Sequence, residues 1–266
     1  LVNGEGAFVI LPSGVAGYAT GNAELGGGGF DLSASLGFRI NKTGVAVDEV
    51  ITVDGRELTF GFSDSETDIL QFFASDLSLN IGDFVSIEGD VQFTQDGAVS
   101  VFAGRNLRIF LGQGPARLPS GDPNPSATGL LLDNASIGLV KDGAAYALVA
   151  TGDIEVVGIN GVTLRGTASI RFNNTDDVVD RTINFPGDEG GNVIVRFTFS
   201  KVNIDPDGVP NNGDEDSVIE VSADKVSLRL GGTAANPLLQ VTQGTGTFRL
   251  TSAGLVGKVA ASVEVN

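Results

Sequence analysis

The chain has 266 residues, of which 41% are apolar, enough for folded cores, and its formal net charge of −17 disfavours nucleic acid as a partner. Cys and His are both absent, which excludes disulfides, Ser-His or Cys-His nucleophile pairs and the usual zinc ligands. No run of 18 apolar residues exists, so we expect no transmembrane segment.

Alternating apolar and polar residues predict β-strands along most of the chain, and no segment shows convincing helical spacing. In residues 83–94 the pattern turns one set of side chains into a core: Val85, Ile87, Val91 and Phe93. It turns the other set toward solvent: Ser86, Glu88, Asp90 and Gln92. In residues 162–172 it turns Ile170 and Phe172 inward and Arg171 outward. Turn signals such as Asp96-Gly97 and Asp142-Gly143 predict hairpins, and therefore antiparallel pairing.

The chain repeats itself. Residues 1–25 align without a gap on residues 241–265, with Gly4, Gly6, Phe8, Gly14, Gly17 and Glu24 matching Gly244, Gly246, Phe248, Gly254, Gly257 and Glu264. The offset is constant at 240 (244 minus 4), and a looser copy covers residues 135–156. The sequence therefore predicts a window from a longer tandem-repeat protein.

A second repeat has an offset of 132 (173 minus 41) and carries Asn41 and Thr43 onto Asn173 and Thr175. Both Asn-x-Thr segments, like Asn134-Ala135-Ser136, could be glycosylation sequons. We favour the alternative that Asn and Thr bond to nearby backbone where a strand bends into a loop.

A third repeated element has the pattern small-x-x-apolar-x-apolar-x-apolar-Gly, in which x is any residue. It occupies residues 74–82, 104–112 and 223–231, and each copy is predicted to form one strand.

These signals predict an all-β protein of antiparallel meander and hairpin repeats, packed as sandwich-like or flattened-barrel units in tandem. An elongated β-solenoid is the alternative. The expected organisation is a first unit over residues 1–113, a Pro/Gly-rich linker or long loop over 114–128, a second unit over 129–235 and the start of a third over 236–266.

The segment 203–214, NIDPDGVPNNGD, has the alternating oxygen ligands and the glycine of an EF-hand-like calcium loop. It resembles the helix-free calcium loops of thrombospondin type 3 repeats. The expected Ca²⁺ ligands are Asn203, Asp205, Asp207, the carbonyl of Val209, Asn211 and Asp214. A solvated acidic loop without metal is the alternative.

The elements ASDLSLNIGDFVSIEGDVQF, KDGAAYALVATGDIEVVGINGVTLRGTASIRFNNT and VVDRTI resemble the tandem repeats of giant bacterial extracellular, adhesin-like proteins. That resemblance implies a structural module of a surface stalk, adhesin or filament, located outside the cell or on its surface. It also implies that neighbouring copies of the repeat are the partners, in one chain or in a homopolymer. It carries no catalytic residue with it.

We therefore expect a non-catalytic structural module. The first alternative is a β module that binds a glycan or a protein through its loops. A less favoured alternative is a polysaccharide-active enzyme that uses paired carboxylates, because nothing in the sequence selects a pair.

Overall fold

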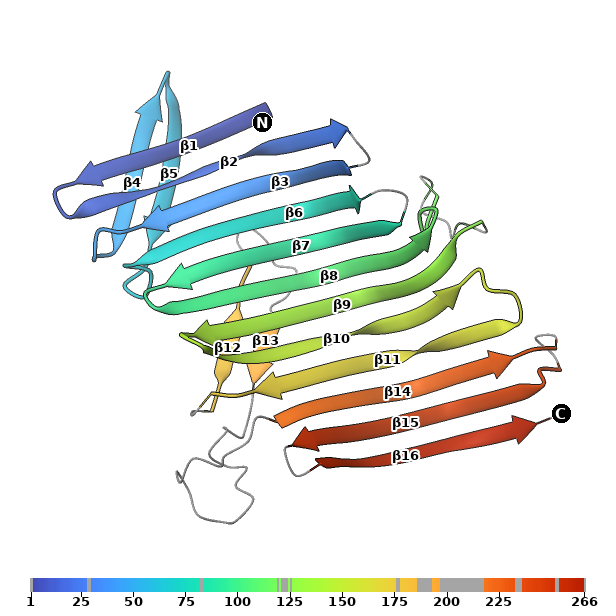
Figure 1. Ribbon diagram of the computed structural model, residues 1–266. Helices are drawn as coiled ribbons and strands as arrows, with labels where there is room; N and C mark the ends of the chain where they lie inside the picture. Colours follow the sequence, from blue (N-terminus) through green and yellow to red (C-terminus); the bar gives the residue numbers. More distant parts are fainter. Residues whose placement is uncertain are drawn as a thin grey trace, which may run out of the picture.

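Twelve strands form one open antiparallel sheet in the computed structural model, in the order β1-β2-β3-β6-β7-β8-β9-β10-β11-β14-β15-β16 (Figure 1). The structure describes residues 2–27, 30–81, 84–118, 120, 124, 126–175, 178–185, 193–196, 218–232, 236–251 and 254–265. All secondary structure in these residues is β. The predicted all-β, antiparallel meander is confirmed.

The strands follow one another along the chain, mostly with short connections; the long connections follow β3, β8 and β11. The first six strands of the sheet are β1 (Val2–Leu11), β2 (Gly14–Gly27), β3 (Phe30–Asn41), β6 (Ile69–Ile81), β7 (Val85–Asp96) and β8 (Val99–Gln113). The other six are β9 (Thr128–Asp142), β10 (Ala145–Val157), β11 (Val162–Asn173), β14 (Val218–Leu230), β15 (Leu239–Thr251) and β16 (Gly254–Val265). Two side hairpins leave the sheet: β4 (Val47–Val53) with β5 (Arg56–Phe62), and β12 (Asp180–Ile183) with β13 (Val193–Arg196).

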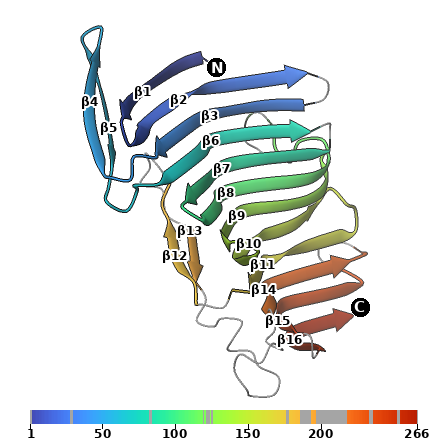
Figure 2. The same ribbon diagram turned by 60° about the vertical axis from the view of Figure 1, so that its left-hand side comes forward.

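Both side hairpins lie on the same side of the sheet, which we call the covered face (Figure 2). The β12–β13 hairpin buries Ile183, Phe185, Val193 and Val195 against Ala103, Val140 and Ala147 of the sheet. The β4–β5 hairpin buries Val47, Phe60 and Phe62 against Ala7, Ala16 and Ile69. The loop after β8 adds a third small core around Phe110, with Ala116, Ala127 and Leu131. A second layer therefore exists only where these segments fold back.

Close packing of the β12–β13 hairpin depends on a glycine of the sheet. A Cβ atom on Gly138 would lie 2.4 Å from Cγ2 of Val195, which is closer than two carbon atoms can approach. The hairpin can thus approach β9 only because position 138 has no side chain.

The opposite side of the sheet carries no described segment over it, and we call it the apolar face. Cross-strand pairing places an unbroken row of large apolar residues on it, from β3 to β11: Phe38, Phe72, Phe93, Phe102, Leu139, Leu148 and Phe172. Phe72 is 48% exposed and Phe93 38% exposed. The alternation in the sequence predicted which residues share a face, and this grouping holds.

The burial predicted for three residues, Phe93, Gln92 and Ile170, is wrong. Phe93, expected in a core, is exposed, and Gln92, expected in solvent, is only 4% exposed. The reason is that Asn184 and Phe185, which follow β12, lie beside the polar side of β7 around Gln92, whereas its apolar side remains open. Ile170 is likewise exposed, while Val85, Ile87, Val91, Phe172 and Arg171 are half-buried.

A set of residues in the left-handed region bends the strands. Asp76, Asn106 and Lys225 have φ values of 52°, 51° and 53°, and each lies where the pairing register shifts by a bulge. They occupy the third position of the small-x-x-apolar element. The bulge moves the following residues by one position, so the apolar residues on both sides of it stay on the same face.

The 240-residue offset has a structural counterpart. Phe8 pairs with Gly17 in the β1–β2 hairpin, and Phe248 pairs with Gly257 in the β15–β16 hairpin. Asn3 and Gln243 both have positive φ, at 53° and 51°. The two hairpins therefore share register and bulge position.

The sheet runs unbroken across the predicted unit boundaries, because β8 and β9 pair directly on either side of residues 114–128. The predicted units are therefore groups of strands within one sheet. The division of the chain into these units stays a prediction.

Candidate functional site

The six residues predicted to bind Ca²⁺, Asn203, Asp205, Asp207, Val209, Asn211 and Asp214, lie outside the described residues. Within the described ranges, no group of three or more Asp or Glu residues is placed to hold a metal ion. The calcium site stays a prediction.

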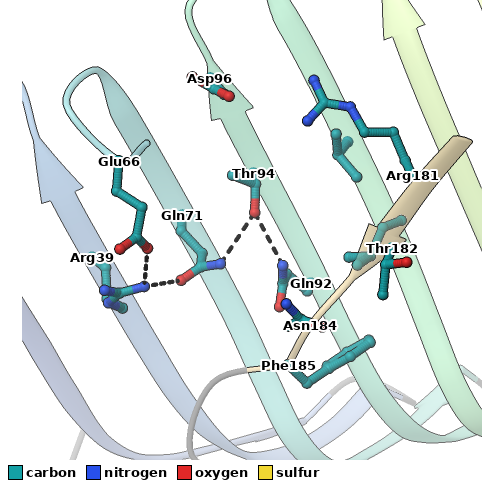
Figure 3. Close-up of a pocket in the computed structure, with 12 residues that line it drawn as sticks. Arg39, Glu66, Gln71, Gln92, Thr94, Asp96, Arg181, Thr182, Asn184 and Phe185 are labelled. Atoms are coloured by element: carbon teal, nitrogen blue, oxygen red, sulfur yellow. Dashed lines mark hydrogen bonds and ion pairs between the residues drawn. The ribbon is translucent and has the colours of Figure 1, made fainter. Parts of the chain in front are cut away.

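A polar cleft lies on the covered face, between β3, β6 and β7 on one side and β12 with the residues after it on the other (Figure 3). Its volume is about 270 Å³. The side chains that line it come from both parts: Arg39, Glu66, Gln71, Gln92, Thr94, Asp96, Val101, Arg181, Thr182, Ile183, Asn184 and Phe185. The sequence analysis selected none of these as a site.

A chain of hydrogen bonds crosses the floor of the cleft. The guanidinium of Arg39 donates from Nη1 to Oε1 of Glu66 at 3.0 Å and to Oε1 of Gln71 at 3.1 Å. Gln71 Nε2 then donates to Oγ1 of Thr94 at 3.2 Å, and Gln92 Nε2 donates to the same oxygen at 3.1 Å. Gln71 and Gln92 are both buried, so this floor is fixed in place.

The Glu66 carboxylate is held ionised by its neighbours. Burial raises the pKa of Glu66, but hydrogen bonds from the Ser63 backbone N–H and the charge and hydrogen bond of Arg39 outweigh this effect. The pKa of Glu66 therefore lies below its ordinary value of 4.5. This carboxylate is suited to hold the side chains around it and not to donate a proton at neutral pH.

One buried acceptor at the cleft has no partner in the described residues. Gln92 Oε1 is shielded from solvent and receives no hydrogen bond. A buried acceptor without a partner can accept a hydrogen bond from a water molecule, or from a hydroxyl or amine group of a small ligand. The cleft is therefore chemically equipped to bind a polar, donor-rich group.

Arginine side chains of the sheet make hydrogen bonds and a cation–π contact to the two side-hairpin segments. Arg39 donates from Nη2 to the carbonyl of Gly61 at 3.0 Å, and Arg171 donates from Nη2 to the carbonyl of Arg196 at 2.8 Å. Arg105 lies 4.3 Å from the centre of the Phe185 ring and donates to Asp90 at 3.1 Å. The 132-residue offset also carries Arg39 onto Arg171 (171 minus 39), so the repeat in the sequence indicates that these two arginines are equivalent.

The apolar face contains a hollow of about 250 Å³ over β8, β9, β10, β11 and β14. Small residues form its floor, namely Ala135, Ala150, Gly152 and Ala168, while larger side chains such as Ile109, Leu132 and Val221 form its walls. The sequence contains a signal for this hollow. The apolar-face positions of β10 and β11 carry small residues (Ala150, Gly152 and Ala168), whereas those of β6 and β7 include Phe72 and Phe93.

No helix of the described residues is long and apolar enough to cross a membrane. No protein-family model matches the chain, and neither a curated protein nor a solved structure matches it.

Proposed function

We propose that this chain is a non-catalytic structural module of a large extracellular bacterial protein, part of a stalk, adhesin or filament. The observation that carries the proposal is the repetition within one sheet. The β1–β2 and β15–β16 hairpins share register and bulge position at an offset of 240 residues, and they lie at the two edges of the sheet. A meander of this kind lengthens when further repeats add strands at an edge.

The placement of the side hairpins supports the same function. One hairpin follows β3 and the other follows β11, and each is preceded by the same Asn-x-Thr segment. The resemblance to adhesin-like repeats supports the extracellular bacterial setting.

Extension of the chain by one period tests the proposal. Residues 27–266 make up one 240-residue period, and Asn266 corresponds to Gly26 in the repeat. A second copy of residues 27–266 joined after Asn266 adds ten strands to the sheet in the correct phase. We expect X-ray scattering to show a longest dimension increased by roughly 48 Å, since neighbouring strands lie about 4.8 Å apart.

A matched control appends residues 1–240 after Asn266. It adds the same number of residues but brings β1 next to β16 without the Gly26–Gly29 connection. The control is expected to form a separate body joined by a flexible segment. If the in-phase extension also behaves as two tethered bodies, the structural-repeat function is wrong.

A second candidate function is binding of a glycan in the polar cleft, which the unpartnered Gln92 Oε1 favours. The test is a screen against neutral oligosaccharides, with Gln92→Met expected to abolish any binding and Gln95→Met expected to preserve it. Absence of binding by the unaltered chain, or equal binding by both variants, excludes this candidate.

A further inference from the structure

The apolar face is too large and too uniform to be the outer surface of an isolated chain. The seven strands from β3 to β11, about 4.8 Å apart, span roughly 29 Å, and twelve or more residues per strand at about 3.3 Å give a face on the order of 1,000 Å². The exposed apolar patches of monomeric proteins reach only a few hundred Å². A stable complex needs about 800 Å² per partner, and obligate homodimers bury more.

The chemistry of the face is that of a protein core. From β6 to β11 its described positions carry apolar or glycine residues, apart from the strand ends, where Gln95, Ser100, Gln113, Thr128 and Lys141 lie. The charged residues of these strands occupy the covered face, where Arg105 pairs with Asp90 and Arg108 with Glu88. Depletion of charge over such an area is typical of obligate interfaces between copies.

We propose that the apolar face is the interface of a homodimer, in which two copies pack face to face as the two layers of a β-sandwich. Sheets pack about 10 Å apart, with their strands within about 30° of each other. This arrangement places the two covered faces on the outside. The acidic residues of the two copies then remain separated and solvated, although each chain carries a net charge of −17.

The apolar face has a raised part and a hollowed part, which can face each other in two copies. A ridge of Phe38, Phe72, Phe93 and Phe102 lies over β3 to β8, and the rings of Phe38 and Phe72 are 5.0 Å apart. The hollow of about 250 Å³ lies over β8 to β14. Consider a two-fold axis that lies between the two sheets and runs parallel to the strands, near β8 and β9. Rotation about this axis places the ridge of each copy opposite the half of the other copy that contains the hollow.

A lipid surface fits the same face less well. Proteins that lie on membranes combine an apolar surface with Lys and Arg that attract anionic head groups. This chain has 16 Lys and Arg against 33 Asp and Glu. The negative charge therefore opposes approach to an anionic bilayer, whereas a second copy offers an apolar surface of the same extent.

Measurement of mass in solution tests the proposal on the intact 266-residue chain. Analytical ultracentrifugation is expected to give twice the chain mass of 27.3 kDa. The double variant Phe93→Asp, Ile170→Asp places two carboxylates in the interface and is expected to raise the dissociation constant at least about 100-fold. The matched control Thr245→Asp, Thr247→Asp adds the same charge to exposed positions of the opposite face and is expected to leave it unchanged.

The absence of Cys allows a second measurement that does not depend on destabilising charges. Chains with the single change Phe93→Cys and chains with the single change Ala150→Cys are mixed and oxidised. Disulfide-linked pairs of one chain of each kind are expected, whereas Thr247→Cys in place of Ala150→Cys is expected to give none.

Three results would overturn the proposal. One is a monomer at about 100 μM, far above the dissociation constant expected for such an interface. Another is a dimer that survives the Phe93→Asp, Ile170→Asp change, which would place the contact elsewhere. The third is a monomer that cosediments with neutral phosphatidylcholine vesicles, which would assign the face to lipid. None of these results affects the X-ray scattering measurement on the chain extended by one repeat. The homodimer proposal can therefore be wrong while the structural-repeat function is right, and the reverse.

Discussion

Asn41 and Asn173 lie 132 residues apart (173 minus 41) and make the same hydrogen bonds at the ends of β3 and β11. Oδ1 of each accepts from the backbone N–H of a Thr two residues later at 3.0 Å and from its Oγ1 at 2.7 Å. Both Asn side chains are fully buried. They are thus part of the fold where the chain leaves the sheet for a side hairpin, as the favoured interpretation of the Asn-x-Thr repeat predicts.

Removal of this amide is expected to destabilise the fold. Asn41→Ala removes the partner of the Thr43 N–H and of the Glu66 carbonyl, at about 1–3 kcal/mol for each group. We expect a loss of roughly 2–4 kcal/mol in urea unfolding. The control Asn22→Ala changes an exposed amide, and its effect should stay within about 0.5 kcal/mol. Equal effects at the two sites would contradict the structural role of Asn41.

Lys225 is the least favourable residue among the bulge positions, because its φ of 53° suits Gly or Asn better than Lys. Lys225→Gly is therefore expected to stabilise the protein by about 0.5–1 kcal/mol in chemical denaturation. The same change at Lys141, within β9 and outside the positive-φ set, is expected to destabilise by about as much. A loss of stability in both variants would show that the bulge geometry is wrong.

The Glu66 carboxylate makes stability depend on pH. Its folded-state pKa is lowered, so its contribution is complete above the ordinary value of 4.5 and is lost as pH falls through the folded pKa. Glu66→Gln should lower the free energy of unfolding most at about pH 7, and this difference should shrink toward about pH 3. The exposed Glu57 provides the control as Glu57→Gln, for which the difference should be small at both values. A difference for Glu66→Gln that grows on acidification would refute the prediction.

Two phenylalanines of the neighbouring strands β7 and β8 are expected to differ in their contribution to stability. Phe110 is 1% exposed, and a Cβ on Gly129 would lie only 2.9 Å from its Cζ, so the ring fills a tight site on the covered face. Phe110→Ala should cost about 3–5 kcal/mol. Phe93→Ala, measured on the dissociated chain, should cost about half as much or less, because the ring is already exposed. Equal costs in dilute solution would mean that the apolar face is covered within one chain.

Calcium binding at residues 203–214 is tested by thermal unfolding with calcium and with a chelator. Three carboxylates in this short segment, Asp205, Asp207 and Asp214, repel one another unless a cation is bound. We expect stabilisation of ~2.7 kcal/mol when calcium exceeds its dissociation constant a hundredfold. The Asp205→Ala, Asp207→Ala double variant should melt at the same temperature in both conditions. Identical melting curves for the unaltered chain would leave an acidic loop without metal.

The sequence alone determined the secondary structure and the grouping of side chains. Period-two alternation predicted strands such as β7 and β11, and the Asp-Gly turns predicted their antiparallel pairing. The 240-residue offset predicted that the first and last hairpins have the same register, as the pairs Phe8 with Gly17 and Phe248 with Gly257 show. These features are local, because the backbone geometry of a strand and its turn depends on neighbouring residues.

Only the tertiary structure decided which face of the sheet is buried. Phe93 and Gln92 are adjacent in β7, and alternation places them on opposite faces without saying which face another segment covers. Packing of the residues after β12 beneath β7 and β8 buried Gln92, and it assembled the cleft from Arg39, Thr94 and Asn184, residues far apart in the chain. The side hairpins return to the sheet through long-range contacts such as Arg105 on Phe185. Such contacts depend on how distant segments meet in space, and no local pattern of residues encodes them.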